Sequence, residues 1–452
     1  MVSVLLLDAD LPNNDPSDRK LTDRLYGGDA EYRLAQEIIL GIGGVRYLRA
    51  LGCATIERFH MNEGHAALLS LELLDQQIER RGGSAADAAD VDAVRRQCVF
   101  TTHTPVAAGH DHFPLELALA VVGREELGRM PPGFSHDGAL NMTYLALHLS
   151  HYVNGVAKRH GEVSRHLLGE RRIEAITNGV HVATWAAPPF LALYDRFLDG
   201  WRSDNFSLRY ALQIPLEEIA AAHQAAKSAL IERVALATGV KLNPAVLTLG
   251  FGRRVTAYKR PGLLLSDLDR LRRIAANVGR LQIVYAGKAH PHDEEGKRLI
   301  AEISRRAVEL GDAVRIVYLE DYGANTARTM VSGVDLWVNT PQPPLEASGT
   351  SGMKAAVNGV PSLSVLDGWW LEGHVEGATG WAIGRDGYES GDGVDDRRDA
   401  EDLYAELERV IVPMFYHRPD DYLAIMRNAI ALTGSFFNTH RMLEQYVSHA
   451  YL

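Results

Sequence analysis

The sequence predicts an α/β protein of two lobes, each a sheet flanked by helices, and three observations lead to this fold class. Short apolar runs alternate with amphipathic helical runs in residues 1–188, and the same alternation returns in residues 246–434. Residues 189–245 are helical in pattern without a strand signal, so we expect them to connect the lobes. A chain of 452 residues, 46% hydrophobic and 23% charged, is long enough for two or three domains with cores of their own.

The first lobe is predicted to alternate between strands and helices. Its strands are expected at SVLLLDAD (3–10), ATIERF (54–59), QCVFTT (97–102) and EAITNGV (174–180). Helical patterns cover residues 29–51, 66–81 and 138–160. Gly41, Gly43 and Gly44 interrupt the first of these, which indicates close packing or a turn.

The second lobe shows the alternation more clearly. Its strands are predicted at VLTLGFGRR (246–254), QIVYAG (282–287), AVRIVYLE (313–320), DLWVNT (335–340), SLSVLDG (362–368) and GWAIG (380–384). Helical runs separate them, so the sheet should be parallel and doubly wound, with its ligands at the carboxyl ends of the strands. A last helix, residues 435–452, is expected to fold back on the first lobe.

Charge and composition exclude several classes of partner. The formal net charge of -11 argues against nucleic acid and anionic membranes, because both require a basic face. Cys53 and Cys98 provide no disulfide framework and suit a reducing compartment. The apolar N-terminal run has no basic segment before it and is predicted to be a strand, and no run reaches membrane-spanning length. We therefore expect a cytoplasmic protein.

The stretch EASGTSGMK, residues 346–354, carries the strongest chemical signal. It follows a predicted strand and a Pro-rich turn, and it leads into a helix. Glycines let the backbone approach a ligand, and the free amides of the helix start, with Thr350 or Ser351 as cap, predict an anion site. Glu346 would bind the hydroxyls of a neutral polyol, and Lys354 would be a cation or an amine nucleophile. The alternative is a glycine-rich connection with a solvated lysine.

Basic side chains follow other strands of the same lobe. They are Arg253, Arg254, Lys259, Arg260 and Lys288. Because the carboxyl ends of parallel strands share one edge, these cations are expected to converge on one cleft. In an acidic protein this predicts a di-anionic or doubly phosphorylated ligand. For any one cation taken singly, a surface salt bridge is the alternative.

The histidines do not predict a metal site. His60 and His65 flank Glu63 with i,i+5 spacing. On a helix this places them about 140° apart, whereas zinc-binding helices use i,i+4 on one face. No cysteine accompanies them, so we expect no structural zinc either.

Several runs, in order along nearly the whole chain, resemble the α-glucan phosphorylases, the family acting on glycogen, starch or maltodextrin. They are TTHT, NGVAKRH, TNGV, RRVTAYKR, AGKA, YLEDYG, EASGTSGMKAAVNG and VLDG. EASGTSGMK is highly specific, and HMNEGH and TNGVH resemble the shorter bacterial and archaeal branch. The resemblance implies two doubly wound, Rossmann-like lobes of the GT-B type.

The resemblance also implies a cofactor and a set of site residues. Pyridoxal 5'-phosphate would be held on Lys354, with the cofactor's phosphate rather than its ring as the reactive group. Further cofactor contacts implied by motif matching are Arg253, Tyr322, Gly349, Thr350 and Trp185. Arg254 and Lys259 match groups that bind the substrate phosphate, and His103, Asn178, Glu346 and Ser348 match groups that hold the glucosyl unit. The catalytic set implied is Lys354, Arg254, Lys259 and Glu346.

The implied reaction is reversible phosphorolysis of an α-1,4-glucan or maltooligosaccharide by inorganic phosphate, giving α-glucose 1-phosphate with retention. The chain resembles the family only from the middle of its first lobe onward. We therefore expect an N-terminal lobe that is incomplete and exposes a sheet edge. The expected protein partner is a complementing N-terminal chain or a second copy in a homodimer.

Two rival interpretations stay open. A GT-B glycosyltransferase using a nucleotide sugar shares the two-lobed outline, but retaining members commonly carry a second glutamate eight residues after the first, where this chain has Lys354. An inactive glucan-binding fragment is favoured by the missing segment and opposed by the intact lysine, arginines and glutamate. A conventional pyridoxal enzyme is disfavoured, since no acidic partner for the pyridine nitrogen is identifiable.

Overall fold

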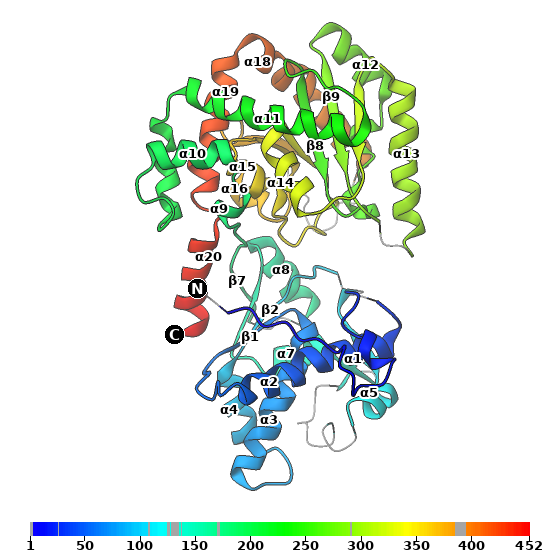
Figure 1. Ribbon diagram of the computed structural model, residues 1–452, viewed down its shortest axis with the longest axis vertical. Coiled ribbons are helices and arrows are strands. Elements are labelled where there is room, and N and C mark those ends of the chain that lie inside the picture. Colours follow the sequence, from blue (N-terminus) through cyan, green and yellow to red (C-terminus); the bar gives the residue numbers. More distant parts are fainter. Residues whose placement is uncertain are drawn as a thin grey trace. The chain divides into compact units, whose positions relative to one another are not determined.

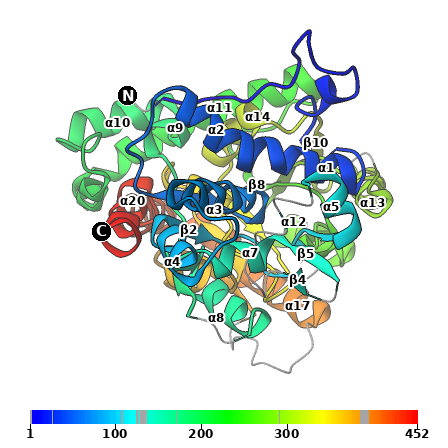
Figure 2. The ribbon, with the colours of Figure 1, turned by 90° about the horizontal axis from the view of Figure 1, so that it is seen from below.

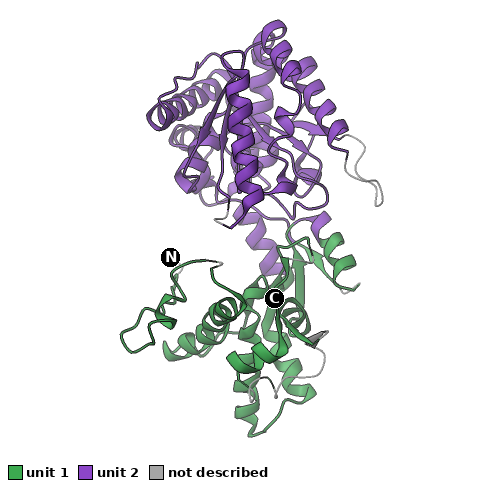
Figure 3. Ribbon diagram, turned by 90° about the vertical axis from the view of Figure 1, so that its right-hand side faces the viewer, with its two compact units in different colours: residues 1–156, 161–175, 449–452 green, residues 157–160, 176–448 purple. Residues whose placement is uncertain are grey.

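The computed structural model describes residues 3–25, 27–106, 109–123, 127, 135–136, 138–169, 172–289, 292–384 and 395–452. The chain divides into two compact units (Figure 3). Unit 1 comprises residues 1–156, 161–175 and 449–452, and unit 2 comprises residues 157–160 and 176–448. Both contain parallel sheets with helices, which confirms the predicted α/β class. Within the described ranges, no helix is both long and apolar enough to cross a membrane.

Unit 1 is built on four parallel strands whose order in the sheet, β1-β2-β6-β7, is their order along the chain. Met61 pairs with Phe100, and Phe100 pairs with Val153. The strands are β1 Phe59–Asn62, β2 Cys98–Thr101, β6 Tyr152–Gly155 and β7 Glu174–Ala175, and β3 His112–Pro114, β4 Ser135–His136 and β5 Ala139–Asn141 form a small antiparallel sheet. The helices are α1 Ala30–Ile38, α2 Gly44–Ala50, α3 Leu68–Arg81, α4 Ala88–Gln97, α5 Leu115–Val121, α7 Met142–His148 and α8 Lys158–Leu167.

The predicted helix at residues 29–51 is present, and of its three glycines Gly41 serves close packing. α1 and α2 run on from one another through a π-helical turn, Ile39–Gly43 (Figure 2). A Cβ added at Gly41 would lie 2.7 Å from the backbone nitrogen of Leu69. The helix therefore approaches the start of α3 more closely than any side chain would allow.

Two predictions for unit 1 are wrong. Residues 3–10 form no strand, and Val4 and Leu6 are 81% and 86% exposed, because no strand of the described chain lies beside this apolar run to pair with it. The region 138–160, predicted as one helix, contains β5, α7, β6 and the start of α8. Its apolar spacing fits a helix, but β6 pairs with β2 and β7 in the sheet, and that long-range pairing overrides the local pattern.

Unit 2 holds a parallel sheet, two strands of which, β8 and β9, are labelled in Figure 1. Its six strands lie in the order β10-β9-β8-β11-β12-β13. All six strands predicted from the sequence are present: β8 Leu247–Gly252, β9 Leu281–Ala286, β10 Arg315–Leu319, β11 Leu336–Asn339, β12 Ser362–Val365 and β13 Gly380–Ile383. The helices are α9 Val182–Trp185, α10 Pro188–Phe197, α11 Leu216–Thr238, α12 Leu268–Asn277, α13 Glu294–Leu310, α14 Ala324–Gly333, α15 Ser351–Ala356, α16 Trp370–Gly373, α17 Asp396–Glu406, α18 Val412–His417, α19 Pro419–Asn428 and α20 Thr439–Tyr446.

Alternate residues of this sheet face two cores. In β9, Ile283 and Tyr285 pack in the core that includes α12, α13 and α17, whereas Val284 and Ala286 pack in the core that includes α11 and α14. Because helices cover both faces, most strand residues are apolar, and every residue of β8 is buried. This double cover explains why the strands of unit 2 are easy to recognise in the sequence.

The region expected as a connector, 189–245, packs inside unit 2. Leu230 and Val234 of α11 lie in one core with Met330 and Val331 of α14. The boundary between the units falls after residue 175, whereas we expected the first lobe to end at 188. Residues 449–452 belong to unit 1, where the Tyr451 hydroxyl lies 2.7 Å from His60 Nδ1.

Candidate functional site

The strand order of unit 2 changes direction between β8 and β11. Later strands add outward from β8 as β9 and β10, and outward from β11 as β12 and β13. In doubly wound sheets ligands bind at the carboxyl edge beside such a reversal, because the loops that leave the two central strands diverge there. Residues 253–260 follow β8 and residues 340–350 follow β11, so both segments lie at that edge.

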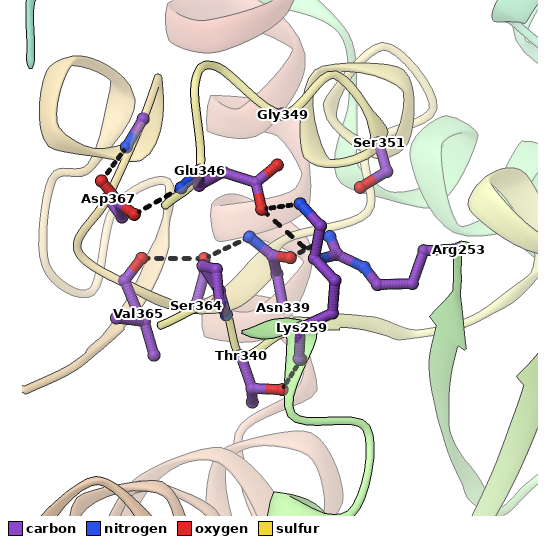
Figure 4. Close-up of polar contacts among 12 residues, drawn as sticks. Arg253, Lys259, Asn339, Thr340, Glu346, Gly349, Ser351, Ser364, Val365 and Asp367 are labelled. Atoms are coloured by element: carbon purple, nitrogen blue, oxygen red, sulfur yellow. Dashed lines mark hydrogen bonds and ion pairs between the residues drawn. The ribbon is translucent and has the colours of Figure 1, made fainter. Parts of the chain in front are cut away.

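Two cations meet the carboxylate of Glu346 (Figure 4). Lys259 Nζ contacts Glu346 Oε2, and Arg253 Nη1 lies 3.4 Å from the same oxygen. Burial alone would raise the pKa of Glu346, but Arg253 and Lys259 outweigh it and hold that pKa below its usual range. The three side chains form one buried charged cluster in which Glu346 is ionised.

The cluster carries more positive than negative charge. Arg253 also contacts Asn339 Oδ1, yet its Nε is buried and finds no hydrogen-bond partner among the described residues. Burial, reinforced by Arg253, lowers the pKa of Lys259 in spite of Glu346. Arg254 is exposed and makes no hydrogen bond or ion pair within the described ranges. This surplus of donors suits an anionic ligand.

Lys354 lies in α15, with its Nζ 3.9 Å from the centroid of the Trp185 ring. Asn358 ties the two residues together, since its Nδ2 donates to the carbonyl oxygens of Lys354 at 2.8 Å and Trp185 at 2.9 Å. Burial lowers the pKa of Lys354, and its amine makes no hydrogen bond with the residues described. A partly desolvated, unpaired amine has the character of a nucleophile.

The N-cap of α15 is Thr350, one of the two residues predicted, but no side chain caps the helix. The Thr350 hydroxyl makes no capping bond, and Ser351 Oγ instead accepts from Trp337 Nε1 at 3.1 Å. The Thr350 backbone, with φ -124° and ψ -8°, also lies outside the extended region usual at an N-cap. Gly349 has φ +71°, and a Cβ there would lie 2.9 Å from Glu346 Oε1, so the turn requires glycine.

Other predicted residues are held by backbone contacts. The Tyr322 hydroxyl donates to the Gly252 carbonyl at 3.0 Å, at the end of β8. Ser348 is 3% exposed, and its carbonyl accepts from Trp369 N at 2.9 Å. Asn178 belongs to unit 2, where its carbonyl accepts from Arg441 Nη2 at 2.9 Å.

Two of the predicted cations lie outside the cluster. Arg260 is buried and donates to the carbonyl oxygens of Thr340 at 3.1 Å and Pro341 at 2.7 Å, so it braces the segment after β11. Lys288 pairs at 2.5 Å with Asp321, whose side chain is 94% exposed. The expectation that all five cations converge is therefore wrong. Arg260 binds backbone carbonyls and also pairs with Asp396 and Asp399, and Lys288 forms the surface salt bridge weighed as its alternative.

In unit 1, His103 follows β2 and is held by its neighbours. Its backbone nitrogen donates to Glu63 Oε2 at 2.7 Å, and its Nε2 lies 2.6 Å from Asn62 Oδ1. Burial lowers the pKa of His103 and lowers that of His60 to about 4, so both rings are neutral at pH 7. Neutral polar groups of this kind suit hydroxyls rather than phosphate.

One group of the described residues has the spacing of metal ligands: Glu37, His65 and Asp111, with ligand atoms within 4.8 Å of one another. His65 Nδ1 lies 2.9 Å from Asp111 Oδ2, and Arg33 Nη2 lies 2.5 Å from the same oxygen. The hydrogen bond to Asp111 and the nearby carboxylate of Glu37, 3.7 Å away, raise the pKa of His65 to about 9. Two cations thus already balance the two carboxylates, and the group is an ion-pair network.

Three polar residues of these sites escaped sequence reasoning: Asn339, Asp367 and Glu63. Asp367 is 2% exposed, and burial raises its pKa to about 7. The runs VLDG and HMNEGH contain two of the three, so the signal was present in the motifs. Their role depends on which strands are neighbours, and spacing along the chain does not show that.

Comparison with known proteins agrees with this geometry. A family model described as Phosphorylase, carbohydrate phosphorylase, matches residues 133–378. A maltodextrin phosphorylase of Thermococcus litoralis is 39% identical over 485 positions, covering 100% of this chain and 57% of the relative. A glycogen phosphorylase of Mycobacterium tuberculosis is 39% identical over 510 positions, covering 100% and 58%. A glycogen phosphorylase of Aquifex aeolicus is 38% identical over 491 positions, covering 99% and 70%.

The chain therefore spans less than two thirds of the length of two of these relatives. The similarity nevertheless runs from end to end of this chain, and the family match takes in β8, β11 and α15, which carry the charged cluster and Lys354. On these grounds the chain belongs to the carbohydrate phosphorylase family.

Proposed function

We propose that the chain is an α-1,4-glucan phosphorylase of the cytoplasm, which transfers a glucosyl unit from the end of a glucan to inorganic phosphate. The product is α-glucose 1-phosphate. The observation that carries the proposal is the buried cluster in which Arg253 and Lys259 converge on Glu346 at the strand reversal of unit 2. It combines a carboxylate for sugar hydroxyls with donors for an anion.

The residues implied by the family resemblance have these tasks in the reaction. Arg254 and Lys259 bind the substrate phosphate, and Glu346, Ser348, His103 and Asn178 bind the glucosyl unit. The glycosidic C1–O bond breaks as a proton of inorganic phosphate passes to the leaving oxygen. A phosphate oxygen then bonds to the same face of C1, so the configuration is retained.

We propose pyridoxal 5'-phosphate as the cofactor. The unpaired amine of Lys354 over Trp185 and the orphaned Nε of Arg253 fit a carbonyl-bearing, phosphorylated aromatic ring. Lys354 would hold the carbonyl carbon, Arg253 and the glycine turn at Gly349–Thr350 the phosphate, and Tyr322 and Trp185 the ring. When bound, the cofactor supplies a second phosphate group beside the substrate phosphate.

We also propose that unit 1 is an incomplete half of a two-lobed GT-B arrangement. Its sheet has four strands that follow chain order without a reversal, whereas the sheet of unit 2 has six strands and one reversal. β1 is an edge strand, so further strands from a complementing chain, or from a second copy of this chain, have a place to pair.

The first test is to incubate the purified chain with pyridoxal phosphate, reduce it with borohydride and map the modified peptides. We expect one phosphopyridoxyl group, on Lys354, and release of glucose 1-phosphate from maltoheptaose and inorganic phosphate. The assay is run on the chain alone and with a complementing N-terminal segment taken from one of the relatives. Arg254→Ala should raise the KM for phosphate.

The rival functions are separate outcomes of the same assay. Transfer from a nucleotide sugar, with no phosphorolysis, would replace the proposal by a glycosyltransferase. Binding of maltoheptaose without turnover in either format would leave a glucan-binding fragment. Random labelling of surface lysines, with Lys354 unmodified, would remove the cofactor assignment.

A further inference from the structure

In unit 1 a buried glutamate holds the backbone of the loop that carries His103. Glu63 directly follows β1, and β1 lies beside β2. Glu63 Oε1 accepts from its own neighbour, Gly64 N, at 3.0 Å, and Oε2 accepts from His103 N at 2.7 Å and from Thr104 Oγ1 at 2.9 Å. The carboxylate therefore fastens the loop after β2 to the loop after β1.

Unit 2 repeats this arrangement with an aspartate. Asp367 follows β12, and β12 lies beside β11. Asp367 Oδ1 accepts from its own neighbour, Gly368 N, at 2.8 Å, and Oδ2 accepts from Glu346 N at 2.9 Å (Figure 4). In both units, a carboxylate after one strand accepts the amide of the glycine that follows it. The same carboxylate accepts a second amide from the loop after the adjacent parallel strand.

Both carboxylates are more than nine-tenths buried, since Glu63 is 8% and Asp367 is 2% exposed. We call each of these arrangements, a carboxylate that joins the loops after two adjacent strands, a clasp. Each clasp includes a residue with a positive φ angle. Glu63 has φ +75° and ψ 168°, a conformation that is nearly restricted to glycine, and Gly368 has φ +54° with its Cβ position 2.3 Å from Ser348 O. Strain of this kind persists where the surrounding structure overrides it, and such sites are often functional.

We infer that Glu63 and Asp367 are matched positioning residues, one in each unit, that hold the backbone of a sugar-binding residue in place. Each acts through the loop it fastens, Glu63 on His103 and Asp367 on Glu346, and neither touches the substrate. This inference rests on the proposed function, because it takes His103 and Glu346 as residues that bind the glucosyl unit. It adds two residues that the motif matching did not assign.

The two acceptor oxygens of each carboxylate are central to the arrangement. An ionised carboxylate accepts two amide hydrogens at once, whereas an amide side chain of the same shape has one acceptor oxygen and presents an NH2 group to the second N–H. Glu63→Gln and Asp367→Asn therefore keep the volume of the side chain and remove half of each clasp. The loop should loosen while the core around it stays packed.

The test compares these two variants with Asp335→Asn. Asp335 is 2% exposed and accepts Thr248 N at 2.7 Å, but it lies at the opposite, amino end of β11. Asp335 is therefore a matched control: it is a buried carboxylate that accepts a backbone amide, but it lies at the end of the strand opposite to the proposed site. Hydrogen exchange is measured in peptides covering residues 100–106 and 344–350, together with KM and kcat for maltoheptaose and the melting temperature.

We expect the amides of 100–106 to exchange about tenfold faster in Glu63→Gln, and those of 344–350 about tenfold faster in Asp367→Asn. The kcat/KM for maltoheptaose should fall about 10- to 100-fold in each, because small displacements of a substrate-holding group have effects of that size. Asp335→Asn should lower the melting temperature at least as much, with both peptides protected and kcat/KM within about twofold of the parent.

Unchanged protection in both peptides would overturn the clasp itself. If Glu63→Gln and Asp367→Asn exchange faster in their peptides but keep a kcat/KM no lower than that of Asp335→Asn, the positioning role is overturned. The two carboxylates would then only stabilise their loops. If the parent chain, alone and complemented, neither binds maltoheptaose nor forms glucose 1-phosphate, the proposed function fails instead. The exchange data then still decide whether the two carboxylates hold their loops.

Discussion

The two units carry polar residues at the carboxyl ends of parallel strands, yet the two sets differ in charge. Unit 2 gathers Arg253, Lys259 and Glu346 into a buried ionised cluster. Unit 1 offers His60 and His103, whose pKa values burial lowers, so that these rings are neutral. The first set suits an anion, and the second suits hydroxyl groups.

Sheet topology accounts for much of this difference. The strand order of unit 2 reverses between β8 and β11, so two long loops leave the sheet in diverging directions and provide room for several long side chains. The four strands of unit 1 follow chain order, and Glu63 joins the loop after β1 to the loop after β2. The same clasp therefore supports a charged site in one unit and a neutral one in the other.

The largest expected effect is on Lys354. Lys354→Ala should abolish the phosphopyridoxyl adduct at that position and reduce phosphorolysis by about 10³-fold or more, since the amine placed over Trp185 is removed. The matched control is Lys241→Ala, an exposed lysine of the same unit, which should keep both. Equal loss in the two variants would break the assignment of the reactive amine to α15.

The next largest effect concerns the stability of unit 2. Asp335 accepts from Lys227 Nζ at 2.6 Å and lies 2.8 Å from His223 Nε2, all three being buried. Asp335→Ala should lower the free energy of unfolding by about 3–5 kcal/mol, because it removes the carboxylate partner of the buried Lys227 side chain. Glu294→Gln, in an exposed pair with Lys297, should change it by less than about 1 kcal/mol. Denaturant titration of both variants measures the difference.

A direct test of the charge comparison pairs Lys259→Gln with His103→Ala. Loss of a charged donor should raise the KM for phosphate about 10- to 100-fold, whereas loss of a neutral partner should raise the KM for maltoheptaose about 2- to 10-fold. Steady-state kinetics with each substrate varied in turn separates the two effects. If Lys259→Gln instead weakened only the glucan, the division of labour between the units would be wrong.

The smallest effect is a pH dependence in unit 1. The hydrogen bond to Asp111 and the nearby carboxylate of Glu37 raise the pKa of His65 from 6.5 to about 9, so the folded state binds the proton more tightly. Its contribution is complete below pH 6.5 and is lost as the pH rises through about 9. Allowing for its partial exposure, we expect a loss of about 1–2 kcal/mol across this window.

His65→Gln should flatten that part of the stability profile, as measured by urea unfolding between pH 6 and pH 9.5, values chosen to bracket the window. The control is His417→Gln in unit 2, for a histidine with no carboxylate partner among the described ion pairs. A slope that survives in His65→Gln would show that another group titrates.

The sequence by itself determined much of unit 2. Helices cover both faces of its sheet, so most strand positions are buried and apolar, and all six strands were predicted. EASGTSGMK likewise identified the turn at Gly349 and the lysine of α15, because a positive φ and a close backbone approach demand glycine at fixed spacing.

Only the tertiary structure decided the rest. Residues 3–10 have the apolar pattern of a strand, but no described strand lies beside them to pair with. β6 lies in a segment whose apolar spacing predicts a helix, because pairing with the distant strand β2 outweighs local propensity. The separation of Arg253 and Lys259 from Arg260 and Lys288 likewise depends on where each long side chain finds a partner. The clasps of Glu63 and Asp367 exist only because particular strands lie side by side, and register between strands is a property of the folded sheet.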